Sequence, residues 1–193
     1  MKAPDFSGML RWPNVPACYG WLSLDRRGQW RMRGEPVTHA GLASFLNRQY
    51  GRDECGNYFV QNGPQRVFVE LDYTPWVLRL ASENTLQTHT GESVDDIRAA
   101  AFDEEGNLLL EFPDGIALLC DRDLPALLDC LCQPDGKAID DAALLGLLKL
   151  VPGSLSALKL RWNDKRVPVR LLHRADVSRH YGFVATPAAA LTE

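Results

Sequence analysis

The fold class is decided first by residues 19–33, which read YGWLSLDRRGQWRMR. Residues 19–25 are typical of a strand, and the turn chemistry of residues 26–28 ends it. In the strand that follows, apolar and basic residues alternate, so Arg31 and Arg33 share one face. The stretch therefore predicts a β-hairpin with one apolar and one basic face.

Outward from this hairpin, the chain favours strands, with three helices between them. One helix is expected over residues 38–50, and two more around 124–131 and 144–151, where apolar residues recur at helical spacing. Further strands are expected at 58–61, 66–71, 76–81, 97–103, 108–112, 116–120, 158–162 and 167–171. Pro168 donates no ladder hydrogen bond, which places the last of these strands at a sheet edge.

The order of these elements sets the expected fold class and domains. Strand and helix do not alternate regularly, which argues against a doubly wound parallel sheet and favours an α+β fold with antiparallel sheets. The chain has 193 residues, enough for one large domain or two small ones, and hydrophilic residues 82–96 suggest a boundary. We expect an irregular arm at 1–18, an N-terminal β-rich subdomain at 19–84, a C-terminal α+β subdomain at 85–184 and a frayed tail at 185–193.

Cysteine content and apolar patterning indicate where in the cell the protein is expected. The five cysteines are odd in number and irregularly spaced, which is typical of a reducing compartment. The N-terminus lacks the apolar run of a signal peptide, and no segment has the roughly 18 uninterrupted apolar residues of a membrane helix. We expect a bacterial, cytoplasmic protein with no membrane partner. The net charge is −4, with three basic and fifteen acidic residues in the stretch 82–141.

No pattern of reactive side chains identifies an enzyme. Cys130 and Cys132 would point in opposite directions on a helix, and no finger-like spacing supplies further metal ligands. The histidines accompany no nucleophile signature, and no glycine-rich phosphate loop is present. We therefore predict no catalytic, cofactor-binding or metal-binding residue and no cofactor. Whether the protein is an enzyme stays open, with the residues favouring a non-enzymatic role.

Aromatic and basic side chains supply the candidate contact surface, because such residues dominate binding hot spots. The leading hypothesis is a binding or regulatory module for a protein or a small ligand. Two alternatives stay open: nucleic-acid binding through basic strand faces, which the pI near 5.6 disfavours, and an enzyme with an unfamiliar site between the subdomains. Homo-oligomerisation also stays open. The candidate contact residues are Tyr73, Trp76, Arg31, Arg33, Lys159 and Arg161.

Several runs resemble a known family. They are YGWLSLD at 19–25, GQW at 28–30, GEPV at 34–37, YFVQNGPQRV at 58–67 and DYTPW at 72–76. These runs resemble an uncharacterised proteobacterial family of unknown function, whose pattern is a strand pair, a Gly-x-Pro-Ile-like turn, a helix and a Pro-containing hairpin. The resemblance is clearest over residues 19–80, with an echo in 158–174 and 180–183, and the leucine-rich stretch 122–151 departs from it. It implies an N-terminal β-roll with one helix plus a C-terminal α+β roll with two helices, and it implies no activity.

Overall fold

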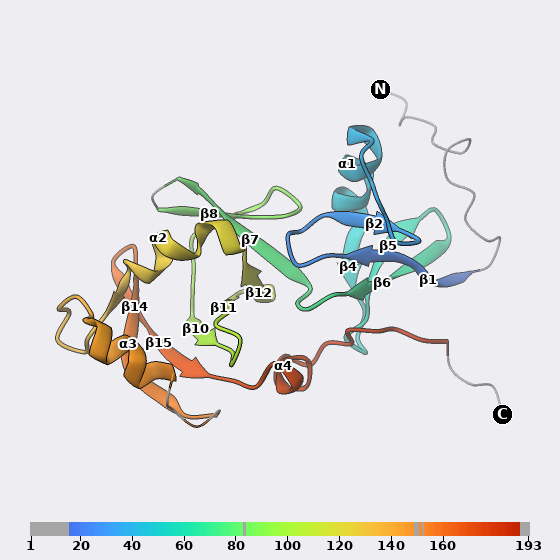
Figure 1. Cartoon of the computed structure of the whole chain (residues 1–193). Coiled ribbons are helices and arrows are strands. Elements are labelled where there is room, and N and C mark those ends of the chain that lie inside the picture. Colours follow the sequence, from blue (N-terminus) through green and yellow to red (C-terminus); the bar gives the residue numbers. More distant parts are fainter. Residues whose placement is uncertain (1–15, 83, 149–150, 152, 190–193) are drawn as a thin grey trace. The chain divides into compact units, whose positions relative to one another are not determined.

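The computed structural model describes residues 16–82, 84–148, 151 and 153–189. The chain divides into two compact units: unit 1 is residues 1–75 with 182–193, and unit 2 is residues 76–181. Each unit holds one sheet together with helical segments (Figure 1). The predicted α+β class is therefore confirmed, while the roll shape of each part stays a prediction. Residues 1–15 of the expected arm lie outside the described residues.

Unit 1 is a six-stranded sheet in the order β3-β2-β1-β6-β5-β4, with one helix. Its elements are β1 (Ala17–Leu24), β2 (Trp30–Met32), β3 (Glu35–Pro36), α1 (Ala40–Gln49), β4 (Tyr50–Arg52), β5 (Tyr58–Asn62) and β6 (Gln65–Leu71).

The core of unit 1 lies on one face of its sheet. Leu22 and Leu24 alternate along β1 on the buried face, and Trp30 of β2 lies directly opposite Leu24. Helix α1 contributes the fully buried Leu46 to the core of this unit. The indole Nε1 of Trp30 donates a 2.6 Å hydrogen bond to Asn47 Oδ1, which ties α1 to this face. The predicted hairpin and its apolar face are thus present.

Unit 2 is a nine-stranded sheet in the order β13-β14-β15-β10-β11-β12-β7-β8-β9. Its strands are β7 (Trp76–Ser82), β8 (Thr85–Thr88), β9 (Ser93–Val94), β10 (Ala99–Phe102), β11 (Leu108–Phe112), β12 (Gly115–Leu119), β13 (Leu131–Cys132), β14 (Leu155–Trp162) and β15 (Lys165–Leu171). Its helical segments are η1 (Asp121–Asp123), α2 (Leu124–Leu128), α3 (Asp141–Leu148) and α4 (Arg174–Tyr181). Within the described residues, no helix is long and apolar enough to cross a membrane.

Both sheets are mixed, so the prediction of antiparallel sheets holds for the strands joined by hairpins and for β13 with β14, but not for every pair of neighbours. The pairs β1 with β6, β7 with β12 and β10 with β15 are parallel. Parallel neighbours need a long connection between them. The sequence pattern reports strands and tight turns, and it carries no signal for which distant strands meet.

Three local predictions in unit 2 are corrected. The helix expected over 124–131 ends at Leu128, because Leu131 and Cys132 pair with β14 as strand β13. The C-terminal part was expected to hold two helices, and the structure adds α4. Strand β15 lies inside the sheet between β14 and β10, although Pro168 favoured an edge; Pro168 precedes the first residue that pairs with β10, Val169.

One loop type recurs at the ends of hairpins in both units. The first residue's N–H donates to the carbonyl of the fifth, and the fourth residue is a glycine with positive φ that donates back to the first carbonyl. This is the pattern of a type I turn followed by a left-handed residue. The loops span residues 25–29, 53–57, 88–92, 103–107 and 133–137.

Candidate functional site

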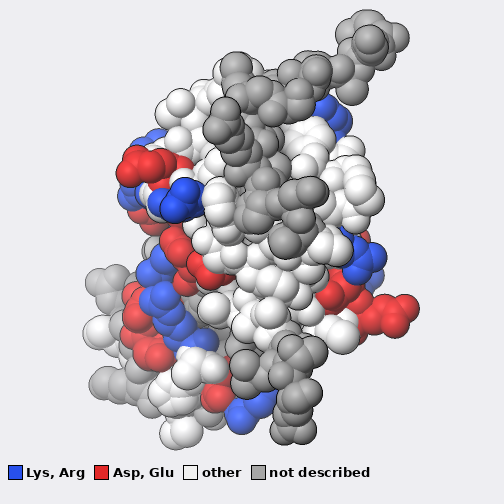
Figure 2. Space-filling model, turned by 90° about the vertical axis from the view of Figure 1, so that its right-hand side faces the viewer, with Lys and Arg blue, Asp and Glu red and all other residues white. Residues whose placement is uncertain are grey.

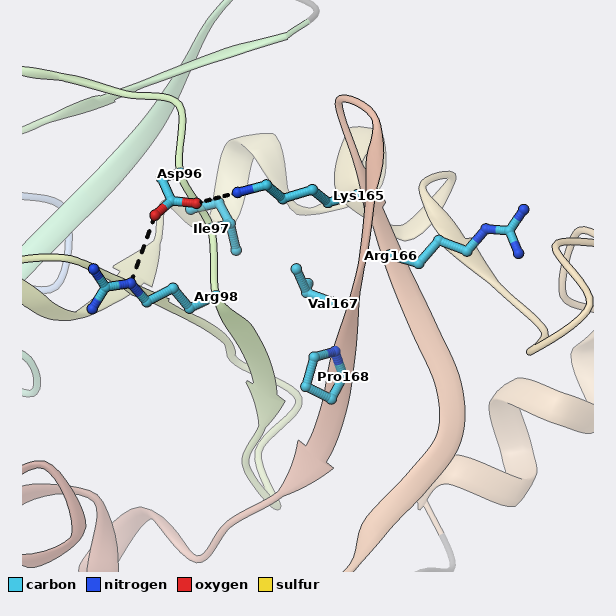
Figure 3. Close-up of a pocket in the computed structure, with 7 residues that line it drawn as sticks. All are labelled: Asp96, Ile97, Arg98, Lys165, Arg166, Val167 and Pro168. Atoms are coloured by element: carbon cyan, nitrogen blue, oxygen red, sulfur yellow. Dashed lines mark hydrogen bonds and ion pairs between the residues drawn. The ribbon is translucent and has the colours of Figure 1, made fainter.

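A charged hollow lies in unit 2 where strands β10 and β15 begin. Its volume is about 540 Å³ and it is open to solvent. We call it the amino-end hollow (Figure 3). It is lined by Asp96, Ile97, Arg98, Lys165, Arg166, Val167 and Pro168.

The hollow forms because the first residues of β10 and β15 do not pair with each other. Their parallel register begins at Ala100 and Val169, so the residues just before these positions form no ladder with each other. Pro168 has no N–H with which to extend the pairing. The side chains of Ile97 and Val167 form an apolar base and are 1% and 4% exposed.

Above this base, one carboxylate is held between two cations. Lys165 Nζ lies 2.6 Å from Asp96 Oδ1, and Arg98 Nε lies 3.6 Å from Asp96 Oδ2. The hydrogen bond from Lys165, and then the charges of Lys165 and Arg98, hold the pKa of Asp96 below its usual value. Arg166 extends away from the others (Figure 3) and lies against Gly136. The hollow thus presents two cations to one carboxylate.

This arrangement has the features of a ligand-binding site. Ligand sites combine an apolar base with a few convergent polar groups, which the hollow provides. Its lining residues include no serine, cysteine, histidine or tyrosine, and the two side chains that could act as a nucleophile or carry a proton, Asp96 and Lys165, are bonded to each other. Over the described parts of the chain, no group of three or more His, Cys, Asp or Glu side chains could hold a metal ion.

The four histidines lie apart from one another in the chain, and each takes part in a separate local interaction. His39 Nδ1 accepts from Leu42 N at the start of α1, and His180 lies 3.3 Å from Arg170. Burial, and then the charge of Arg79, lowers the pKa of His89 to about 3. His173 pairs with Glu104 at 3.4 Å. They do not form a common site.

The two aromatic candidates from the sequence are packed within their own units. Tyr73 is only 6% exposed, so it offers little contact surface. Trp76 is half-buried, with its ring 6.0 Å from that of Phe112, and its Nε1 donates to the carbonyl of Asp114. Both side chains therefore contribute to packing, and only Trp76 keeps an appreciable exposed part.

The four basic candidates form two separate pairs. In unit 1, Arg31 is bonded to Asp25, whereas exposed Arg33 stacks 4.7 Å from the Trp21 ring. In unit 2, Lys159 and Arg161 alternate on β14, opposite Pro168 and Arg166 of β15. The structure thus brings Lys159 and Arg161 beside the strand that lines the hollow.

The sequence did not reveal the hollow itself. Asp96 ends the hydrophilic stretch 82–96, and Lys165 lies between the strands expected at 158–162 and 167–171. These two residues are 69 positions apart, and no local pattern connects them. Pro168 was the one available signal, since a proline in a strand marks a place where pairing is interrupted.

Comparison with known proteins places the chain in a family. Residues 3–188 match the family described as "Protein of unknown function (DUF2946)". The chain belongs to this family. The expected relationship to an uncharacterised family is confirmed, and the family description states no activity.

One of two similar solved structures supports the fold of this chain. A crystal structure of a DUF1285 family protein from Silicibacter pomeroyi DSS-3 is similar, with a TM-score of 0.53, 18% identity and coverage of 88% of this chain and 89% of that one. A DUF1285 family protein from Shewanella baltica OS155 matches 54% of this chain and 87% of its own, with 14% identity and a TM-score of 0.42. No curated protein matches the chain. The first likeness shows the fold alone.

Proposed function

We propose that this protein is a non-enzymatic binding module that takes a small anionic ligand in the amino-end hollow. The observation that carries the proposal is the pair Arg98 and Lys165, gathered around one carboxylate over the apolar base. The cations exceed the carboxylate in number at this point. A ligand with a carboxylate or phosphate group would meet both, and its apolar part would lie on Ile97 and Val167.

Asp96 has a specific role in this proposal. It occupies the place of the ligand's anionic group when the hollow is empty, so a ligand competes with it for the two cations. Charge-assisted hydrogen bonds from arginine and lysine to oxyanions are strong enough to sustain such exchange. The competition makes the sign of one substitution unusual: removing the carboxylate improves binding.

The proposal is tested by calorimetric titration of the full chain with citrate and with inorganic phosphate. We expect Arg98→Gln and Lys165→Gln to weaken binding by about threefold to tenfold, the range for one exposed charged contact. Asp96→Asn should strengthen binding by a similar factor. Arg122→Gln is the matched control, because Arg122 is an exposed arginine of unit 2 that does not line the hollow.

Two results would count against the hollow as a ligand site. Equal loss in Arg122→Gln and Arg98→Gln would mean that only the total charge matters. Weaker or unchanged binding in Asp96→Asn would mean that Asp96 holds the hollow together and does not compete with a ligand.

We also propose a cytoplasmic location. All five cysteines are free thiols, and that of Cys55 is exposed. An exposed thiol is best preserved in a reducing compartment. Alkylation of Cys55 in intact cells, compared with lysate, measures its redox state directly.

A further inference from the structure

The sheet of unit 1 carries an arginine–aromatic face on the side opposite its core. Along each strand, side chains alternate between the two faces. Leu22 and Val67 point to the core, so their neighbours Trp21 and Phe68 point the other way. We define the face by six residues: Tyr19, Trp21, Arg33, Phe59, Arg66 and Phe68.

The rings and guanidinium groups of this face lie on one another. Tyr19 stacks on Phe68 with ring centroids 4.5 Å apart and planes within 1° of parallel. Phe59 meets Phe68 edge-on at 6.1 Å, directly across from it in the sheet. Arg66 lies 4.6 Å from the Phe59 ring centroid. Arg33, in the turn that follows β2, lies over the ring of Trp21 on β1 and completes the face.

Neither arginine forms an ion pair with a carboxylate among the described residues, although the charge of Arg66 helps to lower the pKa of Asp53. Arg31, Arg174 and Arg179 each form an ion pair, whereas Arg33 and Arg66 form none within the described chain and are exposed. A guanidinium stacked on a ring keeps its N–H edge available for a carboxylate. The stacking also fixes the side chain in advance, which reduces the entropy cost of binding.

Arg33 occupies a backbone position that costs free energy. It has φ +52° in the two-residue turn between β2 and β3, where Asn-Gly is preferred. The turn between β14 and β15 has Asn163 at the corresponding position, with φ +51°. An arginine kept where asparagine is easier points to a use for its side chain.

We propose that the arginine–aromatic face binds an acidic, extended protein segment. Carboxylates would bond to the edges of Arg33 and Arg66, and apolar side chains would lie over Tyr19, which covers Phe68. This surface is in unit 1 and is separate from the amino-end hollow. Glu70 follows Phe68 on the same face and would border the bound segment.

The geometry disfavours two other binding modes. Nucleic-acid bases need free ring faces, and here Tyr19, Arg33 and Arg66 already cover Phe68, Trp21 and Phe59. On the side of the molecule drawn in Figure 2, the described basic side chains lie in small groups beside acidic ones, whereas binding to a phosphate backbone is favoured by a clustered basic patch.

Addition of a strand to the sheet edge is also disfavoured. The edge strands β3 and β4 have two and three residues, and β3 contains Pro36. Short edges with proline resist pairing with another chain. Recognition would therefore use the face of the sheet.

The test is fluorescence anisotropy of the full chain with a short labelled peptide of alternating glutamate and leucine. We expect Arg33→Gln and Arg66→Gln each to weaken binding by about threefold to tenfold. Arg48→Gln removes the same charge from exposed Arg48 on α1, whose buried residues belong to the core, and should leave binding unchanged. Arg33→Asn keeps the turn and removes the guanidinium, so it should lose binding with no loss of unfolding temperature.

Each remaining outcome overturns the proposal. These are no binding of the peptide, equal binding of its glutamine counterpart, tighter binding of labelled oligothymidylate, or an equal loss in Arg48→Gln. A fall in unfolding temperature with retained binding in Arg33→Asn would make Arg33 a structural residue only.

Discussion

At the scale of single residues, two glycines in the same loop type separate backbone strain from crowding. Gly56 and Gly106 have φ +85° and +81° in equivalent positions of their loops. A Cβ at Gly56 would lie 2.4 Å from the carbonyl oxygen of Gly182, whereas a Cβ at Gly106 would meet nothing within 4 Å. We expect Gly106→Ala to lower the free energy of unfolding by about 1 kcal/mol through backbone strain alone.

Gly56→Ala should cost about 1–3 kcal/mol more, because the neighbouring backbone must move. Urea unfolding of the two variants, compared with the wild type, measures the difference. Equal losses would contradict the clash and leave only the strain term. The pattern of turn glycines could be read from the sequence. The close approach of Gly182 to Gly56 could not be predicted in this way, because the two residues are 126 positions apart and no local pattern connects them.

At the scale of elements, α4 shows what sequence pattern misses. Its residues, RADVSRHY, bury only Val177, so they carry no apolar period. The helix is instead fixed at its start by a loop: Arg174 N donates a 2.8 Å hydrogen bond to Glu104 Oε2, and the Arg174 guanidinium pairs with Glu105. Helix α1, by contrast, could be predicted, because the residues that it buries, Leu42 and Leu46, recur at helical spacing in the sequence.

The cap on α4 gives a prediction with a matched control. Glu104→Ala leaves the Arg174 N–H without its acceptor, and we expect a loss of about 0.5–1 kcal/mol of local stability, at the low end for an exposed cap. Hydrogen exchange of the α4 amides should accelerate accordingly. Glu54 holds the same place in the equivalent loop 53–57, so Glu54→Ala should leave α4 unchanged. Unaltered exchange in Glu104→Ala would show that the cap is not what holds α4.

The same cap should depend on pH. The hydrogen bond from Arg174 N is the largest of the causes that lower the pKa of Glu104 below 4.5. A carboxyl with a lowered folded-state pKa stabilises the fold fully above its unfolded value and loses that effect as pH falls through the folded value. Protection of α4 should therefore decline below about pH 4.5 in the wild type, and less so in Glu104→Ala.

At the scale of the whole molecule, the positions of the strands and the fold class could be predicted from the sequence. Which distant segments contact one another could not. Hairpins such as β11–β12 follow from alternation and a Pro-Asp-Gly turn. The expected boundary after residue 84 followed hydrophilicity, whereas the compact units divide after Pro75 because β7 pairs with β12. Contacts between distant segments also bring residues 182–189 back to unit 1, and these contacts have no signature in a local pattern.

This return of the chain supplies the last prediction. Leu71 N donates to the carbonyl of Ala185 at 2.8 Å, Val184 N donates to that of Gly56 at 3.0 Å, and Phe183 is 6% exposed. Deleting residues 183–193 removes two hydrogen bonds and one buried aromatic side chain, which together contribute about 3–6 kcal/mol. We expect faster hydrogen exchange at Leu71 and a lower urea midpoint for unit 1. Deleting only residues 190–193 leaves each of these contacts in place and serves as the control; if both deletions behave alike, the returning segment does not stabilise unit 1.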